Sequence, residues 1–538
     1  MAGARIEAPY YPIIYVRGYA GTSSEVEDTV SDPYMGFNLG STRVRTVWTG
    51  QTDRLYFESP LVRLMKDYQY TDVYSVGLNK TDVKEFPGGD LDPRSIIIYR
   101  YYDQVSSVFG AGKQVAMEDF GKGLNDLILK VKRNVCKPDD VEANAAFKVY
   151  LVGHSMGGLV IRCFLQNPKV GTEEARRLVD KVFTYATPHN GIELEIVGNV
   201  PGFFTANSAD NFNRARMASY LGLPDGTDPV NTLNGAFNPD RFFCLVGSNA
   251  KDYTVAAGWS SRVVGPFSDG LVRINNAVLA SSGKPNESLQ LSPRAYVHRS
   301  HSGYYGIVNS EEGYQNLIRF LFGDIRVDGR LDIRSITLPA DLQKEKEKAK
   351  AKGEKKRIRA SYHFETVAGV RGAHWELSRR TLAENSSVFR TYADLFPDEA
   401  EPDEIARANH ESPELFTAFL SKASKVNKNR NSLGFSIDLR VLVPDYEVDG
   451  ILFLDNHFPG GHIFRDRLNI EAIPDDEVPG GWRIRYSFES DNPTKATTGM
   501  LGTPLGDRLE FRIPIKQPRP PGIDADLVLT ARRWREPS

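Results

Sequence analysis

The sequence predicts an α/β protein with a mostly parallel central sheet, followed by a mainly antiparallel, β-sandwich-like domain. From about residue 11 to 323, short β-branched apolar runs alternate with helical patterns, which is how crossover helices build a parallel sheet. After residue 323 apolar residues recur at every second position, as in Trp482–Glu489, which is typical of half-buried antiparallel strands. We therefore expect one domain at residues 1–323 and a second at residues 324–538.

Length and composition agree with two globular domains. The 538 residues exceed what one compact core holds, and 41% hydrophobic with 25% charged residues is ordinary globular composition. With 67 basic and 69 acidic residues, the formal net charge is −2, so we expect no nucleic-acid partner. The three cysteines have no CxxC spacing, which predicts neither a disulfide framework nor a zinc site. Without a signal-peptide pattern or an apolar run of about eighteen residues, we expect no transmembrane segment and a cytoplasmic location.

Seven apolar runs of the first domain are the expected strands of the central sheet. They are short and mostly apolar, as strands covered on both faces must be. They lie at Ile13–Val16, Val73–Val76, Ile96–Tyr99, Val149–Val152, Val182–Tyr185, Phe242–Val246 and Ala295–Val297. Apolar residues from Phe120 to Val135 repeat with helical spacing, and a last helix is expected to stop at Gly323.

One connection of the first domain is far longer than usual. An insertion at about residues 191–237 separates two of the expected strands, and ordinary connections have only a few residues. Its first part carries the apolar residues Ile192, Leu194, Ile196, Val197, Val200, Phe203 and Phe204. We interpret the insertion as a cap or lid whose apolar side chains suit acyl chains. A packed surface excursion with its own small core is the alternative.

The second domain is expected to consist of strands joined by turns rich in proline and glycine. Pro459–Gly461 and Pro479–Gly481 are such turns. The residues Asp455–His462 include metal-ligand types, but we interpret them as a hairpin connection rather than a metal site. We assign no function to this domain.

Two segments of the second domain depart from the strand pattern. Ser412–Leu420 has a helical pattern in which Ser412 is the expected N-cap and Pro413 the first helical residue. A charged loop at about residues 341–359 is interpreted as a solvated helical or disordered segment. Peripheral contact of this loop with an anionic membrane surface is the alternative.

The most informative residues form a Gly-x-Ser-x-Gly turn. The strand at Val149–Val152 runs directly into Gly153-His154-Ser155-Met156-Gly157, and a helical pattern follows at once. A serine on such a tight turn projects from the sheet edge, and the flanking residues must be glycine because side chains there would clash. The helix N-terminus offers N–H groups to a developing negative charge. Ser155 is therefore the predicted nucleophile.

A serine nucleophile needs a general base. His298 and His301 both follow the last expected strand and precede the last helix, and we prefer His301 because it has left the strand. His298 is the alternative. His154 lies inside the turn and cannot reach round to Ser155, and we interpret His189 as a residue of the pocket wall or of the structural framework.

A carboxylate and two backbone N–H groups complete the predicted site. Asp269 follows the strand at Phe242–Val246 and precedes His301 by 32 residues, which satisfies the chain order serine, acid, histidine. The N–H of Met156 and that of Tyr19, in the loop after the first strand, are the expected donors of an oxyanion hole.

These segments together resemble the lipase-like branch of the α/β-hydrolases, including the GPI inositol-deacylase type. The resemblance covers about residues 11–323 and rests on Val16–Gly21, Gly153–Gly158, Ala186–Gly191, Ser268–Val272 and the His301 loop. It implies that Ser155 attacks an ester carbonyl, that His301 takes the serine proton, and that water hydrolyses the acyl-enzyme without a metal or an organic cofactor. These lipases usually carry His-Gly in the oxyanion loop, where this chain has Arg17 and thus a cation near the mouth of the site.

The sequence thus predicts a serine hydrolase of carboxylic esters, a lipase or esterase that acts on acyl-ester or lipid-like substrates. Arg17, His154 and His189 are the expected substrate contacts. One alternative is a non-catalytic lipid- or protein-binding scaffold, and another is an amidase or thioesterase with the same triad. The oligomeric state is not indicated by any pattern.

Overall fold

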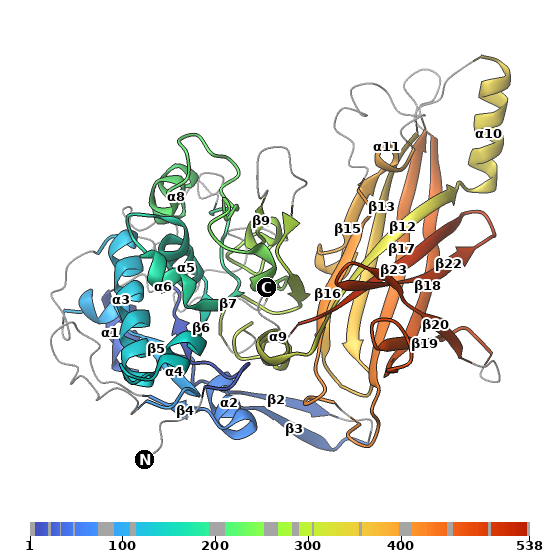
Figure 1. Ribbon diagram of the computed structural model, residues 1–538. Coiled ribbons are helices and arrows are strands. Elements are labelled where there is room, and N and C mark those ends of the chain that lie inside the picture. The colour runs from blue at the N-terminus through green and yellow to red at the C-terminus, as the bar shows by residue number, and fades with distance from the viewer. Residues whose placement is uncertain are drawn as a thin grey trace. The chain divides into compact units, whose positions relative to one another are not determined.

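The computed structural model describes most of the chain, in two compact units. The described residues are 6–19, 23–32, 34–46, 49–73, 91–107, 115–192, 210–251, 267–281, 290–303, 306–353, 358–396, 411–425, 427–448, 456–492 and 497–534. The first unit is Met1–Phe322 and the second is Gly323–Glu536. In Figure 1 the first runs from blue to green and the second from yellow to red.

The first unit is built on a seven-stranded sheet in the order β11-β8-β7-β6-β1-β5-β4, in which all neighbours are parallel. Its strands are β1 (Ile13–Val16), β4 (Thr71–Asp72), β5 (Ser95–Tyr99), β6 (Val149–His154), β7 (Val179–Tyr185), β8 (Phe242–Gly247) and β11 (Arg294–Val297). The predicted parallel α/β sheet is confirmed. Only Val73 of the strand expected at Val73–Val76 is described, and the rest lies outside the described residues.

Helices and two small hairpins complete the first unit. The helices are α1 (Ser23–Ser31), α2 (Pro60–Tyr68), α3 (Met117–Val135), α4 (Val141–Ala146), α5 (Met156–Gln166), α6 (Glu173–Arg177), α8 (Arg214–Leu221) and α9 (Glu311–Phe322). The hairpins are β2 (Ser41–Thr46) with β3 (Thr52–Phe57), and β9 (Ala280–Ser281) with β10 (Gln290–Leu291). Helix α5 packs on β6 and β1, and α9 packs on β7, β8 and β11. None of the helices in the described ranges is long and apolar enough to cross a membrane.

The described part of the long insertion packs firmly on the first unit. Residues 210–237 contain a short 3-10 turn (Asp210–Phe212) and α8, whose Met217, Tyr220 and Leu221 are fully buried. The carbonyl of Tyr220 accepts hydrogen bonds from Cys163 at the centre of α5 and from Asn167 just beyond it. This half of the insertion is a packed excursion. Of the apolar residues expected to line a lid, those from Leu194 to Phe204 lie outside the described residues.

The second unit consists of two antiparallel sheets. One has the order β16-β12-β23-β22-β21, and the other β14-β13-β17-β18-β19-β20 with β15 also paired to β13. The strands are β12 (Ile325–Thr337), β13 (Ile358–Val370), β14 (Glu376–Arg380), β15 (Val388–Thr391), β16 (Glu414–Leu420), β17 (Leu433–Val448), β18 (Asn456–Pro474), β19 (Trp482–Phe488), β20 (Thr498–Leu501), β21 (Thr503–Leu505), β22 (Arg508–Gln517) and β23 (Gly522–Arg533). Both sheets contribute inward side chains to one hydrophobic core, including Leu331, Ile437, Leu439 and Leu527. The predicted antiparallel, sandwich-like fold of this region is confirmed.

Two sequence predictions for the second unit are wrong. Ser412–Leu420 does not form a helix, because Glu414–Leu420 is strand β16 and pairs with β12. From Leu415 to Leu420 every residue is buried, because this strand is covered on both faces and its sequence therefore lacks the alternation of a half-buried strand. Pro459–Gly461 is not a hairpin turn, because strand β18 continues through it beside β17. A bulge between Val441 and Leu442 adjusts the register there.

The charged segment 341–359 contains a helix. Helix α10 (Ala340–Ala351) fills most of it and buries only Leu342 and Ala349, while β13 begins at Ile358. Of the two expected forms, solvated helix and disordered loop, the described residues adopt the helix.

Candidate active site

Ser155 lies between the central strand β6 and helix α5 in a strained backbone conformation. Its φ and ψ angles are 52° and −126°, a region that residues with a Cβ rarely adopt. Three hydrogen bonds hold this turn: the Ser155 N–H donates to the Tyr185 carbonyl, and the Ser155 carbonyl accepts from the Gly158 N–H and the Thr187 hydroxyl. A strained serine held in this way is typical of a nucleophile turn at the edge of a parallel sheet.

Glycines allow the loop after β1 to approach this turn. A Cβ at Gly157 would lie 2.1 Å from the Val16 carbonyl oxygen, and a Cβ at Gly18 would lie 2.8 Å from the Cβ of Ser155. Neither position has room for a side chain. The backbone of the loop that contains Tyr19 therefore lies directly beside the serine.

A chain of two hydrogen bonds connects Ser155 to His301 and Asp269. The Ser155 Oγ lies 2.9 Å from His301 Nε2, and His301 Nδ1 lies 2.9 Å from Asp269 Oδ2. Because the carboxylate can only accept, Nδ1 carries the ring proton and Nε2 is left to accept from the serine hydroxyl. All three side chains are buried. A serine in this arrangement can act as a nucleophile with the histidine as its base.

Asp269 is held rigidly within its loop. Its Oδ1 accepts hydrogen bonds from the N–H groups of Leu271 (3.0 Å) and Val272 (2.8 Å). Its backbone carbonyl accepts from the N–H of His301, so the loops that carry acid and histidine are also joined through the main chain. His298, the alternative base, is exposed at the end of β11. The structure brings His301 and not His298 to the serine.

His154 supports the histidine loop instead of the serine hydroxyl. Its Nε2 donates to the His301 carbonyl oxygen at 3.0 Å, and the two ring centres are 5.1 Å apart. Burial, with a smaller contribution from the nearby His301, lowers the pKa of His154 to about 3, so its ring is neutral at physiological pH. The ring thus fixes the main chain of His301.

His189 is part of the framework below the site. Its side chain is fully buried, its Nε2 lies 3.1 Å from the Thr184 hydroxyl, and its ring packs edge-on against Phe242. Burial, together with the Arg162 charge, holds the pKa of His189 well below its usual value. This environment favours the structural interpretation of His189 over a place in the pocket wall.

The remaining predicted residues lie around the loop after β1. Met156 is the first residue of α5, where backbone N–H groups have no partner within the helix. The Tyr19 ring packs edge-on against Phe212 of the insertion, with ring centres 6.2 Å apart. The guanidinium of Arg17 donates to the Met35 carbonyl, and the Arg17 carbonyl accepts from the Tyr101 hydroxyl. Arg17 therefore anchors the loop from which Tyr19 projects.

Two residues near the site had no predicted role. Thr187 donates its hydroxyl to the Ser155 carbonyl, although the only sequence signal was its place in the Ala186–Gly191 segment. Arg162 is fully buried in α5 and donates to Gln166 Oε1 and to the carbonyls of His189, Val230 and Thr232. An arginine in the otherwise apolar run of α5 is a signal that could have identified it. Among the described residues, no three His, Cys, Asp or Glu side chains gather in a way that could hold a metal ion.

A comparison with models of known protein families gives a match that includes the serine turn and helix α5. Residues 110–221 match a family model described as the PGAP1-like alpha/beta domain. No curated protein matches the chain. Among solved structures, the mature lipase BlEst2 of Bacillus licheniformis is 14% identical over 59% of this chain and 93% of its own, with a TM-score of 0.28. Its propeptide form is 11% identical over 88% of this chain and 96% of its own, with a TM-score of 0.30.

TM-scores this low indicate only a distant structural resemblance to the two lipases, and we infer nothing from it. The family match covers about a fifth of the chain, including β6, the Ser155 turn and α5. The strands of the described sheet are parallel, as predicted for an α/β-hydrolase, and the family match supports a hydrolase in general terms. The family match and the fold together confirm the resemblance of the first unit to the lipase-like α/β-hydrolases.

Proposed function

We propose that this chain is a serine hydrolase of carboxylic esters, a lipase or esterase. One observation carries the proposal: the buried, continuous hydrogen-bond chain from Asp269 through His301 to Ser155, with both links at 2.9 Å. Ser155 is the nucleophile, His301 the general base, and Asp269 the group that orients His301 and stabilises its charged form.

In the proposed reaction, the Ser155 Oγ attacks the ester carbonyl while its proton passes to His301 Nε2. The negative oxygen of the tetrahedral intermediate accepts hydrogen bonds from the N–H groups of Met156 and Tyr19. Collapse of the intermediate expels the alcohol, which takes the proton from Nε2. Water then attacks the acyl-enzyme, with His301 again as the base, and releases the acid. The close approach of Gly18 to Ser155 supports Tyr19 as the second donor.

The proposed substrates are acyl esters with an apolar chain. The contact of Tyr19 with Phe212 supports this proposal, because it brings an apolar residue of the insertion next to the proposed oxyanion loop. Apolar walls suit hydrocarbon chains, since their burial releases ordered water. A series of p-nitrophenyl esters of increasing chain length, with matched thioesters and amides, identifies the preferred bond and length.

The first prediction concerns Ser155 itself. A fluorophosphonate probe should label the wild-type protein and leave Ser155→Ala unlabelled, because only an activated serine reacts. Ser248→Ala is the matched control: Ser248 is also buried and directly follows a strand of the same sheet, β8, but its hydroxyl donates to the Val297 carbonyl instead of a histidine. Equal labelling of wild type and Ser155→Ala would refute Ser155 as the nucleophile. Ester hydrolysis that disappears in His301→Ala would exclude the non-catalytic scaffold.

We extend the proposal to a reducing, cytoplasmic location. Cys136, Cys163 and Cys244 are all free and buried. Proteins of oxidising compartments use their cysteines in disulfides far more often. Cell fractionation with an antibody to the chain tests this location.

A further inference from the structure

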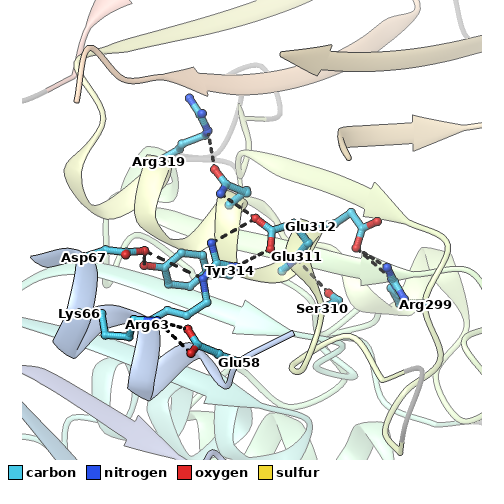
Figure 2. A network of polar contacts seen from close by, with 12 residues as sticks. Glu58, Arg63, Lys66, Asp67, Arg299, Ser310, Glu311, Glu312, Tyr314 and Arg319 are labelled. Carbon is cyan, nitrogen blue, oxygen red and sulfur yellow. Dashed lines mark hydrogen bonds and ion pairs between the residues drawn. The ribbon is translucent and has the colours of Figure 1, made fainter. Parts of the chain in front are cut away.

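Two neighbouring glutamates in the first turn of α9 bind arginines from different parts of the first unit. Glu311 receives Nη1 and Nη2 of Arg63, from helix α2, at 2.5 and 3.2 Å. Glu312 receives Nη2 and Nε of Arg299 at 2.6 and 3.0 Å. Figure 2 shows the two carboxylates directed to opposite sides of the helix. One pair therefore joins two helices, and the other joins α9 to the loop that carries His301.

Arg299 lies two residues before His301, and its side chain is only 7% exposed. Its carbonyl accepts the N–H of Asn249, which follows β8. His301 is held through its main chain by Asp269 and His154. The Arg299 side chain adds a connection from the same loop to α9.

Helix α9 has anchors outside this loop. Tyr314 donates its hydroxyl to Asp67 of α2 at 2.8 Å, and the Arg63 guanidinium lies 3.7 Å above the Tyr314 ring (Figure 2). Ser310 caps the helix by accepting the Gly313 N–H. The helix is thus a rigid support, and Glu312 presents its carboxylate from that support to Arg299.

We propose that the Arg299–Glu312 ion pair is a positioning element that holds His301 in line with Ser155. This inference rests on the proposed function for its kinetic consequence. Removal of Glu312 would leave a buried, unpaired guanidinium next to the His301 loop, and the loop would move to restore its solvation. A small displacement of Nε2 from the serine hydroxyl lowers the rate of the chemical step without removing a contact with the substrate.

The adjacent glutamate provides a matched control. Glu312→Ala and Glu311→Ala each remove one acid from the same helical turn and break one double hydrogen bond to arginine. Glu311 also accepts from Gln315, so its loss should cost at least as much thermal stability. We expect Glu312→Ala to lower kcat for ester hydrolysis by roughly 10- to 100-fold with KM within about twofold, whereas kcat of Glu311→Ala stays within about twofold of wild type.

Two further measurements separate positioning from general destabilisation. Glu312→Gln keeps an acceptor for Arg299 and should restore part of kcat. The downfield proton resonance of His301 Nδ1–H, assigned by its loss in His301→Ala, should shift or broaden in Glu312→Ala and stay in place in Glu311→Ala. This resonance reports the geometry even if no ester is hydrolysed, so an inactive wild type would refute the proposed function alone. Equal effects of the two alanine variants on kcat and on the resonance, or an unchanged Glu312→Ala, would overturn the positioning role.

Discussion

Every polar atom of His301 has a partner within the described site. Its N–H donates to the Asp269 carbonyl and its carbonyl accepts from His154, while the two ring nitrogens meet Asp269 and Ser155. A rotation of the ring breaks two hydrogen bonds, and a shift of the main chain breaks two others. The histidine is therefore held in one orientation before any substrate binds, which lowers the reorganisation needed during the reaction.

At the same scale, His189 should make the fold sensitive to acid. Its pKa is held well below the usual value by burial, so it stays neutral in the folded state. Below about pH 6.5 the unfolded chain gains a proton on this residue that the folded chain does not, so the free energy of unfolding falls by about 1.4 kcal/mol per pH unit. Above this pH both states are neutral and the contribution is constant.

Denaturant unfolding of wild type and His189→Gln from pH 7.5 to 5 measures this effect. The variant should be less stable at pH 7.5, because its amide does not fit the site of the imidazole, yet it should lose stability less steeply as the pH falls. His298→Gln, at an exposed position, is the control and should follow the wild-type curve. Parallel curves for all three proteins would contradict the assignment.

At the scale of elements, helix α5 connects the serine turn to the last part of the insertion, near Val230 and Thr232. Arg162 supplies the connection, since it donates to the carbonyls of Val230 and Thr232 as well as to His189. Within the described residues its partners are all neutral oxygens, and burial lowers its pKa to about 10. A guanidinium is suited to this position because its fork of donors can satisfy several carbonyls that would otherwise be buried without a partner.

Arg162→Met should therefore destabilise the first unit without removing a group of the proposed reaction. The carbonyls of His189 and Val230 lose this donor, whereas that of Thr232 still accepts from the Gln166 side chain. Each buried acceptor left unsatisfied costs about 1–3 kcal/mol, so we expect a loss of roughly 2–6 kcal/mol in the free energy of unfolding. Arg133→Met, on the exposed face of α3, should change stability by less than about 0.5 kcal/mol. Denaturant titration measures both, and equal values for the two variants would contradict the role of Arg162.

The strands and the serine turn could be predicted for a physical reason. Parallel strands are buried on both faces, so Val149–Val152 and Phe242–Val246 stand out as apolar runs, and the turn at Ser155 needs glycines at fixed spacing. The strand at Glu414–Leu420 was missed because its pairing with β12 lies about 90 residues away, beyond any local pattern. Likewise, the local sequence around Arg299 and Glu312 contains no pattern that predicts their ion pair.

At the scale of the whole molecule, each unit has its own hydrophobic interior. The second unit buries residues of both sheets in one core, among them Leu439 with no exposed surface. The first unit buries Leu124 of α3 in the same way. Separate cores are the property of domains that can unfold as independent units.

We therefore expect core substitutions to act on one unit at a time. Leu439→Ala should lower the unfolding free energy of the second unit by roughly 2–5 kcal/mol, and Leu124→Ala should do the same to the first. Fluorophosphonate labelling reports the integrity of the Ser155 site, while calorimetry reports both units. During heating, labelling should be lost early in Leu124→Ala and at the wild-type temperature in Leu439→Ala. Early loss in both variants would mean that the second unit stabilises the site, because an independent domain with an intact core keeps its serine turn when its neighbour unfolds.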